Sequence, residues 1–437
     1  SAEQHIVSPQ TARAIIVPAP GGDDSDIQVI KTILALTNDP QRRPEPYHVV
    51  AVIRDPANLA VARLVGRDEV QYVLTADLIA RIISQTCRQS GLSVVYTELL
   101  DFGRDEIYFQ EEPVLVGRSF GEALLAYEDS AVLGLQKREG PVLLNPPMTT
   151  LIGPGDRIIA ISADDDTVRV SGGVPEVDEA AIRERRPVLP MPERFLILGW
   201  NRHAPSVLRE LDAYVAPGSE VLLVAEPETA CELAVGTLAP ALAHMSVTAR
   251  AGDTCDRPTL DGLGLAGYNH VIVLSAEGLS PEAADARTLV TLLHLRDLAD
   301  RQGTRLSITS EMLDLRNREL AEVTRADDFV VSDRLVSLML SQLAENKHLG
   351  EVFQDLFDAD GSELYLKPAA DYVELGTPVS FYTVVEAARR RGEVAVGYRL
   401  SAEHSRAERA YGVHLNPRKS RRVAFGEGDR IIVLAES

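Results

Sequence analysis

The sequence predicts an α/β protein with two tandem units, each a doubly wound parallel Rossmann-type sheet followed by a linking helix and a small α+β lobe. Three observations carry this prediction. The 437 residues suffice for several domains. Short β-branched runs alternate with helical patterns, as they do in parallel sheets covered by helices. Segments near residues 14 and 101 also recur later in the chain, which indicates a long internal repeat.

The repeat is clearest where two distant segments share one offset. Residues 14–20 match residues 271–277, and Asp101 and Glu106 match Asp358 and Glu363 at the same offset. A later match, between the Gly-Asp turns at 155–156 and 428–429, has a larger offset, which predicts an insertion around residues 401–410. Each unit therefore ends in a lobe whose last strand follows a Gly-Asp turn.

The second unit shows its elements in order. Its apolar runs predict strands at 194–198, 220–224, 245–248, 270–275, 306–309 and 329–331, with helices at 205–214 and 282–301. The first unit begins at the equivalent of the fourth strand, so we expect the first half of its sheet upstream of residue 1. The predicted segments are a partial Rossmann-like lobe (1–91), a linking segment and small lobe (92–170), a proline-rich linker (171–193), a second Rossmann-like lobe (194–345), and a second linking segment and small lobe (346–437).

Composition excludes several classes of function. The 44 Lys and Arg residues against 65 Asp and Glu residues give a net charge of −21, which disfavours nucleic acid as a partner because phosphates would be repelled. Cys87, Cys231 and Cys255 are too few and too scattered for a disulfide framework, which favours a reducing compartment. No apolar run reaches 18 residues, so we expect this chain to be soluble and any membrane spans to lie upstream.

A Rossmann sheet binds its ligand at the turn between its first strand and first helix. Residues 199–204 keep the first Gly and the last Ala of the dinucleotide-binding pattern, but Asn201 replaces the middle glycine that lets a pyrophosphate approach the backbone. The candidate cofactor-binding residues are Gly199, Asn201, Glu226 after the second strand and Asp253 after the third. Asn201 disfavours NAD(P), and the alternative is a degenerate nucleotide fold in which these residues only form turns.

Two acidic turns are candidate metal sites. Hard cations such as Ca²⁺ require six to eight oxygen ligands, so neither turn is sufficient alone and ligands from another lobe or subunit would be needed. Polar turns without a metal are the alternative. The candidate ligands are Asp358, Asp360 and Glu363, with Asp101, Asp105 and Glu106 as the equivalent set in the first unit.

The sequence offers no constellation for catalysis. Nothing resembles a nucleophile triad, and the nine histidines show no spacing typical of a zinc site. Two Rossmann-type sheets and two small lobes without catalytic residues indicate a sensor rather than an enzyme.

The order of sheet, linking helix and Gly-Asp lobe, twice over, resembles the RCK (regulator of K⁺ conductance) units of ligand-gated cation channels and of TrkA-type transport subunits. More narrowly, five segments are similar to the CASTOR/POLLUX channel family: residues 11–17, 198–200, 343–346, 356–365 and 393–398. The resemblance implies a gating ring at the cytoplasmic face of a membrane, formed as a homo-oligomeric, tetrameric ring beneath an upstream transmembrane pore domain. It also implies Ca²⁺ as the effector.

Two classes of function are therefore open. The first is a ligand-sensing region that couples effector binding to the opening of a cation channel, which a ligand achieves only through different affinities for two states of the ring. The second is an NAD(P)-binding regulatory protein or oxidoreductase without a pore, since the fold supports many chemistries.

Overall fold

The computed structural model describes residues 8–22, 24–184, 190–226, 231–317, 328–357 and 361–436. The chain divides into two compact units. We call residues 1–84 with 193–350 the sheet unit, and residues 85–192 with 351–437 the lobe unit. Each unit thus combines segments from both halves of the sequence, and each is described by itself.

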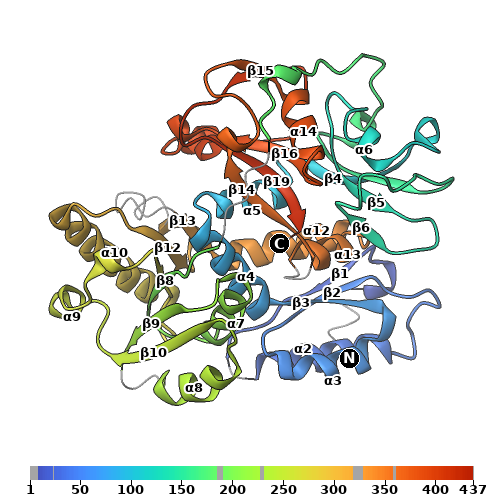
Figure 1. The fold of residues 1–437 in the computed structure, drawn as a ribbon. Coiled ribbons are helices and arrows are strands. Elements are labelled where there is room, and N and C mark those ends of the chain that lie inside the picture. The colour runs from blue at the N-terminus through green and yellow to red at the C-terminus, as the bar shows by residue number, and fades with distance from the viewer. Residues whose placement is uncertain are drawn as a thin grey trace. The chain divides into compact units, whose positions relative to one another are not determined.

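A six-stranded parallel sheet forms the larger part of the sheet unit (Figure 1), with the strand order β10-β9-β8-β11-β12-β13. This is the Rossmann order, in which the chain reverses direction across the sheet between β8 and β11. The strands are β8 (Arg194–Leu198), β9 (Ser219–Ala225), β10 (Met245–Ala251), β11 (His270–Val273), β12 (Ser307–Met312) and β13 (Asp328–Val331). All six lie where the sequence predicts strands, to within three residues at each end.

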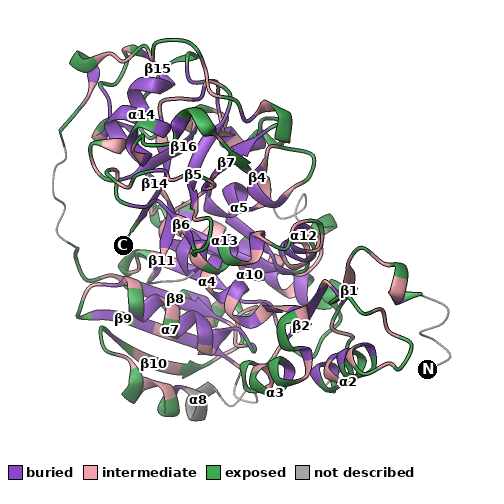
Figure 2. Cartoon of the chain, turned by 90° about the vertical axis from the view of Figure 1, so that its right-hand side faces the viewer, coloured by how far each residue is buried: buried purple, intermediate pink, exposed green. Residues whose placement is uncertain are grey.

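The helices of this sheet are α7 (Ala204–Tyr214), α8 (Cys231–Leu238), α9 (Arg257–Asp261), α10 (Pro281–Gln302) and α12 (Ser332–Glu345). The predictions of α7 and α10 are confirmed to within one residue. Figure 2 shows β8 and β9 largely buried, as expected for parallel strands with helices on both faces. The core beneath them is aliphatic, with Leu196, Val271, Leu292 and Met312 all buried.

A second, three-stranded parallel sheet has the order β1-β2-β3. Its strands are β1 (Ile15–Val17), β2 (Val49–Ile53) and β3 (Val70–Leu74), and its helices are α2 (Ser25–Thr37), α3 (Pro56–Gly66) and α4 (Thr75–Arg88). The elements β1, α2, β2, β3 and α4 follow one another in the same order as β11, α10, β12, β13 and α12. Among the described residues, the first sheet therefore contains the equivalents of the last three strands of the second sheet, as predicted.

One buried aspartate in each sheet supports this equivalence at atomic detail. Asp26 on α2 accepts hydrogen bonds from two backbone N–H groups after β2 and from the side chain of Asn58. Asp285 on α10 accepts the same three bonds, from two N–H groups after β12 and from Asn317, and all six distances are 2.8–2.9 Å. Both carboxylates tie the N-terminal part of a helix to the loop after the next strand.

The lobe unit contains two four-stranded antiparallel sheets of identical order, β4-β7-β5-β6 and β14-β19-β16-β17. The first has β4 (Glu106–Glu111), β5 (Ala131–Gln136), β6 (Val142–Leu144) and β7 (Arg157–Ser162); the second has β14 (Ser362–Pro368), β16 (Val394–Arg399), β17 (Val413–Leu415) and β19 (Arg430–Glu436). The helices are α5 (Leu92–Leu100) and α6 (Phe120–Ala123), with α13 (Leu349–Leu356) and α14 (Phe381–Arg389) as their equivalents, and β15 (Pro378–Ser380) pairs with β18 (Arg422–Ala424). The predicted tandem architecture is confirmed.

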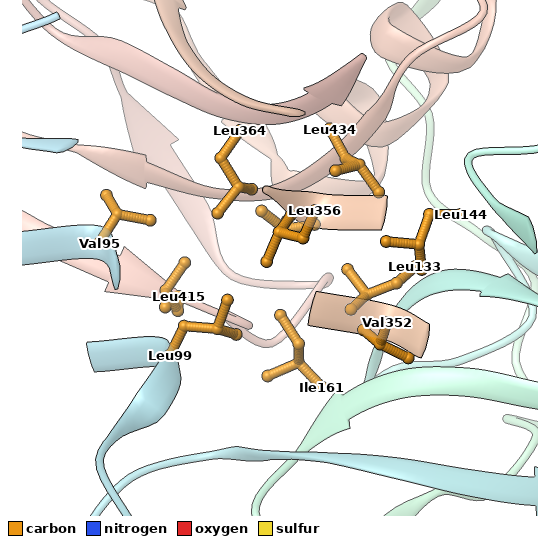
Figure 3. Close-up of a pocket in the computed structure, with 11 residues that line it drawn as sticks. Val95, Leu99, Leu133, Leu144, Ile161, Val352, Leu356, Leu364, Leu415 and Leu434 are labelled. Carbon is orange, nitrogen blue, oxygen red and sulfur yellow. The ribbon is translucent and has the colours of Figure 1, made fainter. Parts of the chain in front are cut away.

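The two lobes pack through equivalent residues. Figure 3 shows aliphatic side chains from both lobes pointing toward one another around a space of about 10 Å³. The equivalent pairs are Val95 and Val352, Leu99 and Leu356, Leu144 and Leu415, and Ile161 and Leu434. A space of this size holds at most one water molecule, so it is part of a packed core and not a ligand site.

Reciprocal hydrogen bonds join the lobes beside this core. The Asn145 side chain donates to the carbonyl oxygen of Gly392 at 3.1 Å, and its equivalent, Asn416, donates to that of Asp129 at 2.9 Å. Both asparagines have a φ of 42°, a left-handed conformation that asparagine tolerates better than most residues. The two lobes are thus related by an approximate two-fold symmetry.

Candidate functional site

A crevice of about 340 Å³ opens at the carboxyl ends of β8 and β11. Its walls include Gly199, Trp200, Glu226, Thr254, Arg287 and Thr291. This is the position where the strand order reverses, and ligands of doubly wound sheets bind at that position. The predicted residues Gly199 and Glu226 both line it.

An ion-pair cluster occupies one side of the crevice. Arg287, on α10, directs its Nη2 atom at both Glu226 and Asp253, with a distance of 2.9 Å to the Asp253 carboxylate. The two predicted acids are therefore brought together, as the positions of their strands imply. Sequence reasoning missed Arg287, which is one of several arginines on a long helix and has no motif to distinguish it.

Gly199 has a role in packing. Its φ is +95°, and a Cβ atom there would lie 2.7 Å from the carbonyl oxygen of Leu274. Such a contact is too close for any side chain, so the approach of the chain after β8 to the chain after β11 requires glycine. This requirement exists without any bound phosphate.

Asn201 points into the interior of the sheet unit. Its Nδ2 atom donates to the carbonyl oxygen of Ser275 at 2.9 Å and to the carboxylate of Glu311 at 2.7 Å. Its Oδ1 atom accepts the N–H of His203 at 2.9 Å. The position that carries the middle glycine of a dinucleotide-binding turn is thus held by a buried side chain with three hydrogen bonds.

Glu311, on β12, is the centre of this buried network. Besides the bond from Asn201, it lies 2.8 Å from Nδ1 of His203, and it accepts bonds from the Ser332 hydroxyl and the Ser275 N–H at 2.9 and 3.2 Å. Burial alone would raise the pKa of Glu311, but the charge of His203 and the hydrogen bonds outweigh burial and lower it. Sequence reasoning missed Glu311, because the strand was predicted at 306–309 and the observed strand continues to Met312.

The predicted metal ligands of the second unit are only partly visible. Asp358 and Asp360 lie outside the described residues. Glu363 is buried on β14, and its two carboxylate oxygens accept hydrogen bonds from Gln85 at 2.6 Å and from the Tyr365 hydroxyl at 2.9 Å.

The equivalent set in the first unit lies in the turn between α5 and β4. Asp101 accepts the N–H of Gly103 at 3.0 Å, Asp105 accepts the side-chain amide of Asn416 at 2.8 Å, and Glu106 begins β4. Within the described part of the chain, the one trio of acidic groups whose ligand atoms all lie within 4.8 Å of one another is elsewhere: Asp164, Asp165 and Asp166, which are all exposed. The metal-binding residues stay a prediction.

Comparisons with known proteins agree with this architecture. The family described as Castor and Pollux, part of voltage-gated ion channel, matches residues 76–178. The ion channel CASTOR of Lotus japonicus is 32% identical to this chain over 98% of its residues, and the ion channel POLLUX of the same plant is also 32% identical over 98%. The chain spans about half the length of these relatives, namely 54% and 50%.

The structure of the human SLO3 gating ring has the same fold, with a TM-score of 0.69 and 15% identity over 99% of this chain and 89% of that one. Among the described residues, no helix combines the length and the apolar character needed to cross a bilayer. The tandem sheets, the paired lobes and the similarity along nearly the whole chain together place this protein in the CASTOR/POLLUX family, of which it carries the RCK-type region.

Proposed function

We propose that this chain is the ligand-sensing gating-ring region of a cation channel and couples the binding of Ca²⁺ to pore opening. In this proposal it forms a homo-oligomeric, tetrameric ring at the cytoplasmic face of a membrane and is joined to an upstream pore domain. The five predicted segments, 1–91, 92–170, 171–193, 194–345 and 346–437, are its functional divisions. Family membership supports the channel, and the crevice supports the sensing of a ligand.

One observation carries the choice of a cation. The carboxylates of Glu226 and Asp253 converge on a single nitrogen atom of Arg287, so a positive charge already occupies the place between them. Both carboxylates are roughly half exposed, which leaves them accessible to a competing ion. A net charge of −21 also opposes assembly, and bound Ca²⁺ would reduce that repulsion.

Displacement of Arg287 offers a route from binding to movement. Arg287 lies two residues after Asp285, whose carboxylate fixes α10 to the loop after β12. In one state Arg287 is paired with the two carboxylates, and in the other state it is released and α10 is free to shift. A ligand that binds the second state more tightly raises its population, and the size of the shift is set by the difference between the two affinities. The acidic turns at Asp358, Asp360 and Glu363, and at Asp101, Asp105 and Glu106, are the second proposed place for Ca²⁺.

Thermal melts against Ca²⁺, Mg²⁺ and K⁺ test this proposal. Occupied sites stabilise the folded state by about 2.7 kcal/mol at a hundredfold excess over Kd, so we expect a rise in melting temperature specific to Ca²⁺. Loss of the rise in Glu226→Gln/Asp253→Asn would assign it to the crevice, and loss in Asp358→Asn/Asp360→Asn to the acidic turn. The control Glu139→Gln/Glu427→Gln changes two exposed turn residues by the same charge and should retain the rise.

No Ca²⁺-specific rise in the wild type would contradict the choice of effector. Light scattering tests the ring separately, and a strictly monomeric species at high micromolar concentration, with and without Ca²⁺, would contradict assembly of this region. Neither result depends on the other.

An NAD(P)-binding regulatory role is the second candidate, because the crevice lies at the dinucleotide position and Glu226 follows the second strand of the sheet. The buried network of Asn201 and the ion pairs of Arg287 weigh against it. The pyrophosphate would meet Asn201 where the pattern requires glycine, and a ribose would have to displace Arg287 from Glu226.

A further inference from the structure

A second cavity, of about 440 Å³, lies within the lobe unit, between the turn that precedes β4 and the segment that precedes and follows β17. The first side contributes Glu98, Arg104 and Asp105. The second side contributes residues 408–410 and 413–418 together with Arg421. We propose that this cavity binds a small zwitterion, a molecule that carries a carboxylate or phosphate group beside an ammonium group.

The segment that forms one wall of the cavity is longer than its counterpart in the first repeat. The strands β5 and β6 are joined by residues 137–141, whereas the equivalent strands β16 and β17 are joined by residues 400–412. The added residues form two short 3-10 helices, at Ser401–Glu403 and Ala407–Gly412, and the second of these provides one wall of the cavity. The insertion expected near residues 401–410 is thus confirmed. It distinguishes the second lobe from the first, to which it is otherwise related by the approximate two-fold symmetry.

The backbone of this wall is strained. Ala410 and Tyr411 both have left-handed conformations, with φ of 48° and 53°, and Gly412 follows with a φ of 85°. Residues with a Cβ atom rarely adopt this conformation, and two in succession persist only where the surrounding structure holds them. Ala410 itself lines the cavity, so the strain lies directly at its surface.

The charges in the cavity are incompletely neutralised. Arg104 pairs with Glu98 at 3.2 Å and Arg418 with Asp129 at 2.9 Å. The guanidinium groups of Arg409 and Arg421, by contrast, form no ion pair with any described residue. Both side chains are exposed to solvent, so they are accessible to a ligand in the cavity.

Two carboxylates in the cavity also lack a cationic partner. Glu408 forms no ion pair or side-chain hydrogen bond with the described residues, and the bond that Asp105 makes is to the neutral amide of Asn416. The cavity thus offers two positive and two negative groups that do not neutralise one another. A simple anion would be repelled by the carboxylates and a simple cation by the arginines, whereas a zwitterion can satisfy both signs through charge-assisted hydrogen bonds.

Isothermal titration with four probes tests this inference: O-phosphoethanolamine and L-glutamate as zwitterions, citrate as an anion and putrescine as a cation. We expect saturable binding of a zwitterion, weakened at least about tenfold in Arg421→Ala and in Glu408→Gln. The control Arg406→Ala removes an exposed arginine of the same insertion. Arg406 does not line the cavity, so this variant should bind the zwitterion as the wild type does.

Thermal melts of the three variants check that folding is intact, which we expect because the replaced side chains form no ion pair with the residues that the structure describes. Binding of citrate or putrescine without binding of either zwitterion would overturn the proposed ligand class. Absence of binding by all four probes, or zwitterion binding that is equal in the wild type and in both cavity variants, would overturn the site.

Discussion

Lys419 is a buried lysine whose equivalent in the first lobe is Met148. Replacing Lys419 with methionine tests directly whether its buried charge reduces the stability of the packed lobes. The backbone roles are the same, because the carbonyl of Met148 accepts the N–H of Gly121 and the carbonyl of Lys419 accepts that of Tyr382. The side chains differ. Lys419 is 2% exposed, and its Nζ donates to the carbonyl oxygen of Ser130. Burial lowers the pKa of Lys419 to about 7 from an ordinary value of 10.5.

This shift determines both the size and the sign of the effect. A fall from 10.5 to about 7 corresponds to an upper limit of about 4–5 kcal/mol of destabilisation at low pH. Loss of the hydrogen bond to Ser130 in the variant offsets about 1 kcal/mol of this gain in stability. We therefore expect Lys419→Met to increase the free energy of unfolding by about 1–4 kcal/mol at pH 7, as replacements of buried charges by apolar residues often do.

The pH dependence follows from proton binding. Between pH 7 and 10.5 the unfolded chain holds a proton that the folded chain releases, so wild-type stability rises with pH in that window. The advantage of Lys419→Met should be largest below pH 7 and shrink as pH rises. Urea unfolding from pH 6 to 9, with amide hydrogen exchange of residues 413–424 as the local readout, measures it. Destabilisation at every pH, or a difference that does not change with pH, would refute the reasoning.

Three further predictions concern other features. Glu311→Gln should lower the free energy of unfolding of the sheet unit by about 1–3 kcal/mol. Because the pKa of Glu311 is lower in the folded than in the unfolded chain, its contribution to stability should be complete above the unfolded pKa and should disappear as pH falls through the folded pKa. The fluorescence of Trp200, the single tryptophan, reports the unfolding transition. Gly134→Ala and Gly397→Ala should each lower the free energy of unfolding by about 2–4 kcal/mol in denaturant melts, because the added Cβ atoms would lie 2.2 and 2.3 Å from backbone carbonyl oxygens. NAD⁺ and NADH should bind about a hundredfold more weakly than to a site with the middle glycine, and low-micromolar binding in calorimetry, abolished by Glu226→Ala, would contradict this.

The architecture was accessible from the sequence because it depends on local patterns that repeat. Apolar strands of the Rossmann type are continuous runs, so β8 was predicted with its observed bounds. The insertion before β17 was visible as a change of offset between two copies of one fold. Glu226 and Asp253 lie near one another because both follow neighbouring strands at the carboxyl edge of the sheet, but their common partner Arg287 was not predicted.

The remaining features depend on contacts between distant segments. Arg287 reaches the crevice from a helix more than 30 residues beyond Asp253, and no spacing rule marks it. The sequence shows Asn201 as an obstacle to phosphate, but its orientation depends on a hydrogen bond to Glu311, which is 110 residues away. Lys419 lies in a run of basic residues that suggests a solvated surface, and only the packing of the two lobes places it in the interior.

The current through the full-length protein in a planar bilayer tests most directly whether Ca²⁺ binding to this region controls a pore. Ca²⁺ is varied from nominally zero to about 1 mM, the range of weak regulatory sites, on the side that carries this region. We expect the open probability to change with Ca²⁺ in the wild type and the midpoint to move to higher Ca²⁺ in Glu226→Gln/Asp253→Asn or in Asp358→Asn/Asp360→Asn. An open probability that stays constant over the whole range would contradict the account.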